Sequence, residues 1–218
     1  MACTYRDVTV TTVLSDPAQD APRIYLASAS PRRRELLAQI GVAHQVLAVP
    51  APPGEDEPRH AGEAAEVYVR RTAREKAERG VRYLRDQALA PLPLLAADTT
   101  VILDGDVLGK PADREDAIAI LQRLSGRAHQ VHTAVVVAAG GMLHEAVSVT
   151  DVRLRPLDRR DIERYCDSGE PFGKAGAYGI QGLAGIFVAH IAGSYTGVMG
   201  LPVFETAELL GRAGVLLP

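Results

Sequence analysis

The sequence predicts an α/β protein in which a mixed, twisted sheet is flanked by helices. Short apolar runs bounded by Gly, Pro or Asp alternate along the chain with amphipathic stretches of helical period. The 218 residues are 47% hydrophobic. A chain of this size buries roughly 70% of its unfolded surface, which suits one large domain or two closely packed lobes.

The chain begins with an extension, followed by a strand that leads directly into a helix. Residues 1–22 end in a segment rich in Pro, Asp and Ala, so they are expected to be a flexible extension before a single domain over 23–218. Residues 23–27 are apolar enough for a buried strand. Ser30 then suits an N-cap and Pro31 the first helical position, so a helix begins there.

The rest of the chain continues to alternate. Further strands are expected at 46–49, 94–103, 107–108, 131–139 and 147–154. Further helices are expected at 63–79, 113–126, 158–167 and 203–210. Gly80 is expected to end the first of these, and Phe204, Ala207 and Leu210 to form the buried face of the last.

One late segment has neither period. Glycine recurs at every third position from Gly173 to Gly185, without the prolines of collagen. Such density indicates positive φ angles, or close approach of a ligand or another chain segment. We therefore expect a backbone-dense loop.

Composition excludes several functions. The net charge of −3 gives no global basic field, so a small anionic ligand fits better than nucleic acid. Cys3 and Cys166 are far apart and match neither a zinc site nor a disulfide scaffold. No apolar run reaches the length of a membrane span, and no export signal is evident. A soluble, cytoplasmic protein is expected.

Three arginines, Arg32, Arg33 and Arg34, occupy the first turn of the first helix, where the helix dipole favours acidic side chains. An anion held by backbone N–H groups and guanidinium groups would reverse this penalty, which is how helix starts become phosphate sites. Ser28 could add a hydroxyl donor or simply cap the helix. The alternative is a solvated basic turn.

Asp98 is the best single candidate for catalysis, because it interrupts an otherwise apolar strand. Buried carboxylates are rare unless they are paired, bound to metal or catalytic. A turn-capping aspartate is the alternative. Lys76 falls on the apolar face of its helix, so its ammonium group must reach a cleft or solvent.

Two further lysines and one acidic cluster complete the candidates. Lys110 and Lys174 each follow a glycine, in positions that also suit ordinary surface lysines. The carboxylates at 55–57 suit a hard cation or a solvated loop. His129 and His132 point to opposite faces of a strand and are expected to be structural. The sequence contains no GxxxxGK[ST], HExxH or GxSxG motif, which removes the commonest ATPase, zinc-protease and serine-hydrolase interpretations.

Five motifs occur together and in order: LASASPRR at 26–33, ADT at 97–99, GKP at 109–111, LSG at 124–126 and KAGAYGIQG at 174–182. Together they resemble the Maf family of nucleotide pyrophosphatases over about residues 23 to 210. The resemblance implies an inosine-triphosphatase-like fold of two lobes around a central cleft, and commonly a homodimer. It also implies hydrolysis of a nucleoside triphosphate to monophosphate and pyrophosphate with a divalent cation such as Mg²⁺ or Mn²⁺.

The resemblance assigns roles to particular residues. Asp98 matches the acidic catalytic residue that accepts a proton from the attacking water. The substrate-binding residues are then Ser28, Arg33, Lys76, Lys110 and Lys174. Glu57 is carried over, with Asp98, as a metal ligand, although the preceding Pro52, Pro53 and Gly54 depart from the family pattern and shift the alignment there.

Three residues match the branch of the family that acts on dTTP and UTP, namely Arg32, Thr99 and Gln181. A Gln amide can accept from a uracil-type N3–H and donate to O4, whereas Glu accepts only. Two alternatives stay open: a nucleotide-sensing regulator of cell division or septum formation, and a pyrophosphatase for methylated GTP or inosine-type purine nucleotides.

Overall fold

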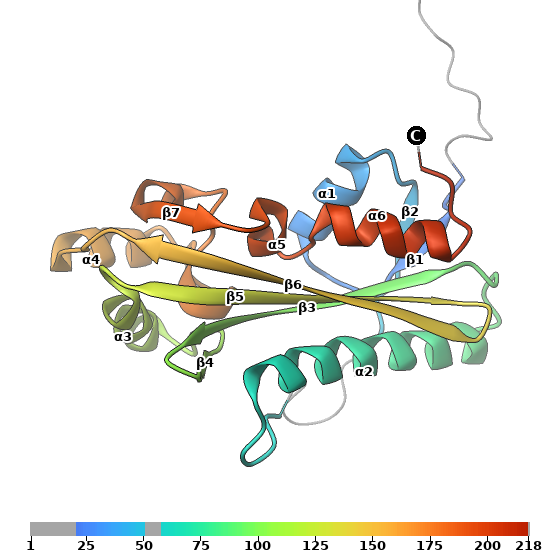
Figure 1. The fold of residues 1–218 in the computed structure, drawn as a ribbon, viewed down its shortest axis with the longest axis horizontal. Coiled ribbons are helices and arrows are strands. Elements are labelled where there is room, and N and C mark those ends of the chain that lie inside the picture. The colour runs from blue at the N-terminus through green and yellow to red at the C-terminus, as the bar shows by residue number, and fades with distance from the viewer. Residues whose placement is uncertain (1–20, 51–57, 218) are drawn as a thin grey trace, which may run out of the picture.

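The computed structural model describes residues 21–50 and 58–217. Over these residues the fold is α/β, with seven strands in one mixed sheet and helices on both of its faces, as the sequence predicts (Figure 1). The strands are β1 (Ile24–Leu26), β2 (His44–Val46), β3 (Leu94–Leu103), β4 (Asp106–Leu108), β5 (Ala128–Ala139), β6 (Met142–Leu154) and β7 (Val188–Ala192). The helices are α1 (Pro31–Gln39), α2 (Ala65–Asp86), α3 (Arg114–Leu124), α4 (Arg159–Asp167), α5 (Tyr195–Met199) and α6 (Val203–Arg212), with short 3₁₀ turns η1 (Ala175–Ala177) and η2 (Leu183–Phe187).

The strand order is β2-β1-β3-β5-β6-β7, and β4 pairs with β3. β1 is parallel to both of its neighbours, β2 and β3. The pairs β3–β5, β5–β6 and β6–β7 are antiparallel. β3 and β5 are the long central strands, and their register places Asp98 opposite Ala134 and Thr99 opposite Thr133. Asp98 and Thr99 therefore lie in mid-strand.

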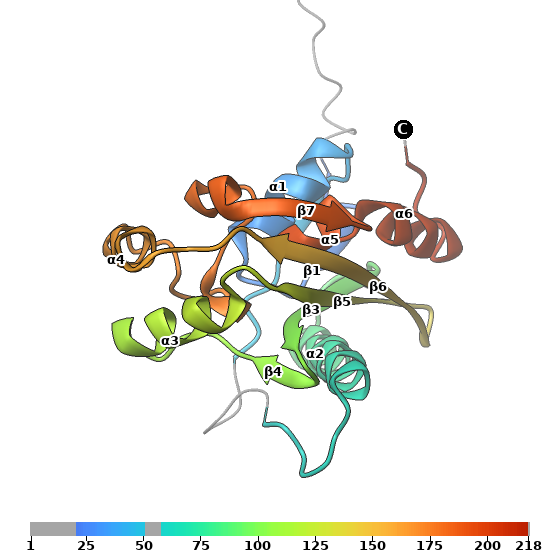
Figure 2. The ribbon, with the colours of Figure 1, turned by 60° about the vertical axis from the view of Figure 1, so that its left-hand side comes forward.

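The helices cover the two faces of the sheet unequally. α2 lies along one face, α1, α5 and α6 lie on the other, and α3 and α4 gather at the far end with β4 and β7 (Figures 1 and 2). The apolar core accordingly has three parts. One lies beneath α2, one beneath α1 and α6, and one around α3, α4 and residues 173–185, which we call the glycine-rich loop. Within the described residues, none of the helices is long and apolar enough to cross a membrane.

Gly80 does not end its helix, which is a correction to the prediction. α2 continues to Asp86, and Gly80 is buried at the point where α2 meets β3. A Cβ there would lie 2.6 Å from the Leu94 side chain. The cost of glycine inside a helix, about 1 kcal/mol, is therefore offset by close packing of helix on sheet.

The buried face of α6 also differs from the prediction. Phe204 is 71% exposed, and α6 instead presents Thr206, Leu209 and Leu210 to the core. These three residues follow the i, i+3, i+4 spacing of one helical face, which is rotated from the face we expected. β2 begins and ends earlier than expected, and β7 and α5 have no counterpart in the prediction.

The glycine-rich loop confirms the prediction of backbone density. Gly173 and Gly176 have φ of 72° and 69°. At Gly176 a Cβ would lie 2.7 Å from the Val101 side chain of β3, and at Gly182 one would lie 2.4 Å from the Glu170 carboxylate. The loop can therefore pack directly onto β3 and onto the chain that follows α4.

Candidate active site

A cavity of about 680 Å³ opens at the centre of the sheet, where α1, α2, α5 and the glycine-rich loop converge on β3. Its volume is in the range of small-molecule sites. Among the described residues, six cationic side chains line it together with a single carboxylate, that of Asp98. The six are Arg32, Arg33, Lys76, Arg79, Lys110 and Lys174. This excess of positive charge favours a polyanionic ligand.

The start of α1 forms one wall of the cavity. Ser30 makes no side-chain capping bond, and its own N–H donates to Ser28 Oγ at 3.2 Å. The first turn carries no acidic residue. The backbone N–H groups and the dipole of this turn are therefore suited to an anion, as the sequence predicted for this helix.

The guanidinium group of Arg33 is held by three different elements. Nε donates to Gly200 O at 2.8 Å, Nη1 to Ser28 Oγ at 3.0 Å and Nη2 to Thr99 Oγ1 at 3.3 Å. Arg32 reaches the same turn, because its Nε donates to Met199 O at 3.3 Å. Both arginines are thereby fixed against the end of α5.

Asp98 is 5% exposed, and its Oδ1 accepts a hydrogen bond of 2.7 Å from Lys76 Nζ. Burial alone would raise the pKa of Asp98, but the charge and hydrogen bond of Lys76, with the charge of Arg33, outweigh burial and hold the pKa below its usual value. Asp98 is therefore a carboxylate at neutral pH. It is an acceptor for a proton or a ligand for a cation.

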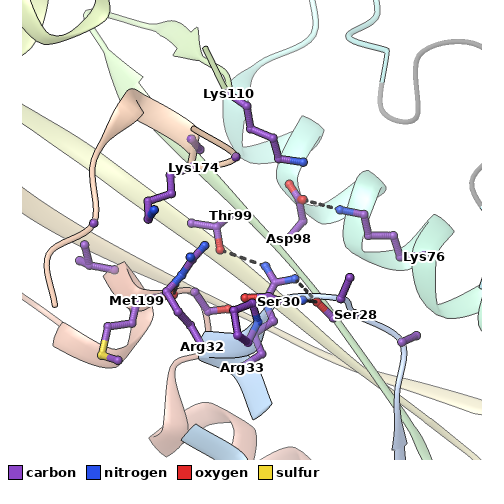
Figure 3. A pocket seen from close by; sticks show the side chains of 18 of the residues that line it. Ser28, Ser30, Arg32, Arg33, Lys76, Asp98, Thr99, Lys110, Lys174 and Met199 are labelled. Atoms are coloured by element: carbon purple, nitrogen blue, oxygen red, sulfur yellow. Dashed lines mark hydrogen bonds and ion pairs between the residues drawn. The ribbon is translucent and has the colours of Figure 1, made fainter. Parts of the chain in front are cut away.

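The remaining lysines enter from the other side of the cavity (Figure 3). Lys110 extends toward Asp98, and Lys174 lies near Thr99 and Arg32. Burial, and then the positive charge of Arg32, lower the pKa of Lys174. A negatively charged ligand between these two cations would relieve their repulsion.

Eight of the ten predicted site residues line this one cavity: Ser28, Arg32, Arg33, Lys76, Asp98, Thr99, Lys110 and Lys174. Gln181 does not; it is exposed and lies two residues beyond Gly179, which does line the cavity. Glu57 lies outside the described residues. The predicted structural roles of His129 and His132 fit their positions on β5, where both are buried.

Sequence reasoning missed several residues of the cavity. Arg79 lies one turn beyond Lys76 on α2, and this i, i+3 spacing was the available signal. Residues 46–49, Phe172 and the Met199–Gly200 turn also line the cavity. The turn contributes the backbone carbonyl groups that hold Arg32 and Arg33, and a pattern of side chains cannot predict such contacts.

This geometry can bind a polyphosphate and accept a proton beside it. The cationic groups surround the only cavity-lining carboxylate of the described residues, and that carboxylate is ionised. Charge that develops on phosphoryl oxygens would meet fixed donors in a partly buried site, where electrostatic stabilisation is strongest.

Comparison with known proteins agrees with this chemistry. A family model described as Maf-like protein matches residues 23–213. The dTTP/UTP pyrophosphatase of Bordetella pertussis is 70% identical over 201 residues, which cover 92% of this chain and 97% of that protein. The dTTP/UTP pyrophosphatases of Chromobacterium violaceum and Ralstonia nicotianae are 55% and 52% identical over 196 and 203 residues, covering 90% of this chain and 97% and 96% of those proteins.

Proposed function

We propose, because this chain belongs to the Maf family, that it is a nucleoside-triphosphate pyrophosphatase, which hydrolyses dTTP and UTP to the monophosphate and pyrophosphate. A relative of that name is 70% identical over 92% of the chain. Modified pyrimidine nucleotides of the same shape belong to the substrate class. Removal of such nucleotides is a house-cleaning role in the nucleotide pool.

The observation that carries the proposal is the ionised Asp98 at the centre of a cationic cavity. Asp98 accepts the proton of the attacking water, and the α1 N-terminus, Ser28 and Arg33 hold phosphate oxygens. Lys76, Lys110 and Lys174 complete the substrate-binding set. Arg32, Thr99 and Gln181 select the base.

The proton affinity of Asp98 depends on whether Lys76 is hydrogen-bonded to it. While Lys76 donates to it at 2.7 Å, Asp98 is a stable carboxylate but a weak base. A phosphate group that draws the Lys76 ammonium away removes the largest influence that lowers the pKa of Asp98. The carboxylate then loses its ammonium partner when substrate is bound, and its oxygens become available to a water proton or to a cation.

A divalent cation such as Mg²⁺ or Mn²⁺ fits the donor chemistry of this cavity. These ions use one or two carboxylates together with substrate phosphates and water. Asp98 supplies one such carboxylate, and Glu57 is proposed as the second ligand. Within 21–50 and 58–217 no cluster of three potential His, Cys, Asp or Glu ligands exists. The phosphates of the substrate would supply further oxygen ligands. When bound, the cation neutralises phosphate charge and polarises water.

Three wider statements belong to the same proposal. The family match over 23–213 supports one two-lobed domain over 23–218, preceded by the extension at 1–22. The resemblance of the motifs supports a homodimer. Two widely separated cysteines, which match no disulfide scaffold, support a cytoplasmic protein.

Release of pyrophosphate from a panel of nucleotides, with Mg²⁺ or Mn²⁺, tests the activity. We expect dTTP and UTP to react faster than CTP, ATP or GTP. Release from none of them would contradict the proposal and favour a nucleotide-sensing protein. Faster release from purine nucleotides would contradict the pyrimidine assignment alone.

Gln181→Glu tests base selection separately, since Glu retains the size of the side chain but loses the amide donor. We expect the preference for dTTP over GTP to fall in the ratio of kcat/KM. An unchanged ratio would remove Gln181 from the base-selecting set.

A further inference from the structure

Thr133 is a buried residue that touches no part of the cavity but is bonded to a residue that does. It is 0% exposed and lies directly opposite Thr99 on β5. Its Oγ1 donates to Gly197 O of α5 at 2.8 Å and lies 3.0 Å from Thr99 Oγ1. Thr99 in turn accepts from Arg33 Nη2. Thr133 is therefore the inner end of a chain of hydrogen bonds that leads to the cavity.

The direction of this chain follows from counting hydrogens. A carbonyl oxygen has no hydrogen, so the contact between Thr133 and Gly197 uses the single hydroxyl hydrogen of Thr133. The reverse arrangement would leave two oxygen lone pairs facing each other at 2.8 Å in a buried place. The hydrogen between the two threonines must then belong to Thr99.

The direction of these hydrogen bonds determines what Thr99 can offer to a ligand. The Thr99 hydroxyl gives its hydrogen to Thr133 and one lone pair to Arg33, so toward the cavity it offers only a lone pair. Thr99 is half-buried and lines the cavity between Arg33 and Lys174 (Figure 3). A ligand group that hydrogen-bonds Thr99 must be a donor.

We propose that Thr133 is a positioning residue that makes Thr99 an obligate acceptor, and that it thereby favours bases presenting a ring N–H over bases presenting a bare ring nitrogen. This rests on the proposed pyrophosphatase function, in which Thr99 contacts the base of the nucleotide. Uracil and thymine carry a hydrogen on N3, whereas cytosine carries a lone pair there. At the N3 position, where cytosine has no donor, the pair Thr99–Thr133 thus favours UTP and dTTP over CTP.

Thr133→Val tests the proposal, because valine keeps the shape and removes only the hydroxyl. The Thr99 hydrogen is released and can turn toward cytosine N3. We expect kcat/KM for CTP relative to UTP to rise roughly 3- to 10-fold, as for a hydrogen bond gained on one side and lost on the other. Thr133→Ser retains the donor and should keep the ratio of the parent protein.

Thr150→Val is the matched control. Thr150 is 1% exposed on the neighbouring strand β6, and its Oγ1 bonds Ser194 O at 3.3 Å and Ser194 N at 2.9 Å. This variant loosens the same segment near α5 without releasing the Thr99 hydrogen, so the CTP to UTP ratio should stay within about twofold of the parent. An equal rise in Thr150→Val would show a packing effect and overturn the proposal.

A double variant closes the test. In a Thr99→Val background there is no Thr99 hydroxyl hydrogen to release, so adding Thr133→Val should not change the CTP to UTP ratio further. If the single variant Thr133→Val folds and its CTP to UTP ratio equals that of the parent, the proposal is overturned. Thr133→Cys, a weak donor, replaces Thr133→Val if thermal unfolding shows that valine is not accommodated. Calorimetric binding of UMP and CMP measures the corresponding ratio of dissociation constants without hydrolysis. A protein that releases no pyrophosphate would contradict the proposed function, and the binding ratio would still test Thr133.

Discussion

Two regions of the sheet each bury a pair of polar side chains. One pair is charged and the other is neutral. In the middle of β3, Asp98 is ionised and paired with Lys76 at the edge of an open cavity. At the start of β5, His129 Nε2 lies 2.8 Å from Tyr178 Oη, and both residues are buried. Burial lowers the pKa of His129 to about 4 and raises that of Tyr178, so this pair is neutral.

The difference teaches where charge is useful. The neutral pair pins the glycine-rich loop to the sheet, and no ligand has to displace it. The charged pair is weaker as a structural device, because desolvation opposes it. Its partners can, however, be exchanged for phosphate or a proton, which the neutral pair cannot offer.

The largest expected effect is at the charged pair. Asp98→Asn preserves the volume and one acceptor oxygen for Lys76, but it cannot take up a proton at neutral pH. Turnover should fall about 10²- to 10⁴-fold, with nucleotide binding and thermal unfolding little changed. Steady-state kinetics and calorimetry measure these quantities.

Asp104→Asn is the control for that variant, because Asp104 follows the same strand and its carboxylate is exposed. It should leave turnover unaltered. Full activity in Asp98→Asn would remove Asp98 from the mechanism and make the charged pair a structural feature like the neutral one.

The next effect is at the neutral pair and concerns stability. The pKa of His129 is about 4 in the folded protein and about 6.5 when unfolded, so between these values the unfolded chain binds the extra proton. The contribution is complete above pH 6.5 and is lost as pH falls toward 4. It should amount to about 3 kcal/mol of the free energy of unfolding.

Urea unfolding of the parent and His129→Gln between pH 7 and 4.5 measures this contribution, since Gln cannot titrate. The variant should lose less stability on acidification. His190→Gln, at an exposed position on β7, should behave as the parent does. Parallel curves for parent and His129→Gln would show that the histidine is not kept neutral by the fold.

The smallest effect is on the loop that joins the two regions. The Glu170 carboxylate accepts from Tyr165 Oη at 2.9 Å and from the N–H groups of Leu183 and Ala184 at 2.9 and 3.3 Å. The Lys174 ammonium donates to the backbone carbonyl of Glu170. Glu170→Gln should cost about 1–2 kcal/mol of stability and raise KM severalfold with a smaller change in kcat.

Glu163→Gln on α4 is the control, because its carboxylate pairs only with exposed Arg159 among the ion pairs of the described residues. It should change neither stability nor KM by a measurable amount. If Glu170→Gln lowered kcat alone, the loop would act on the chemical step and not on the position of Lys174.

Sequence patterns predicted features that depend on neighbouring residues. Asp113 and Asp158 cap α3 and α4 with bonds to N–H groups three residues ahead, at the two positions where the expected helices begin. Asp98 was recognisable because a carboxylate in an apolar strand needs a partner. Its partner Lys76 was a candidate for the corresponding reason, a charge on an apolar helical face.

Other features depend on distant contacts, so the sequence could not predict them. Gly80 looked like a helix end because its local signal is the same whether the chain stops or packs against Leu94. Phe204 looked like a core residue because its helix is amphipathic in more than one phase. The bond from Arg33 to Gly200 joins positions 167 apart, and no periodicity spans that distance.

The contact between Arg33 and Gly200 also determines when, during folding, the substrate-binding site is complete. The guanidinium groups of Arg32 and Arg33 rest on the carbonyls of residues 199 and 200. A chain synthesised only through β6 holds Ser28, Thr99 and Asp98 but lacks these two carbonyls, so Arg33 has only part of its support and Arg32 lacks this contact. Such long-range closure is slow compared with local structure. During synthesis and refolding, substrate binding should therefore arise last, after the sheet itself has formed.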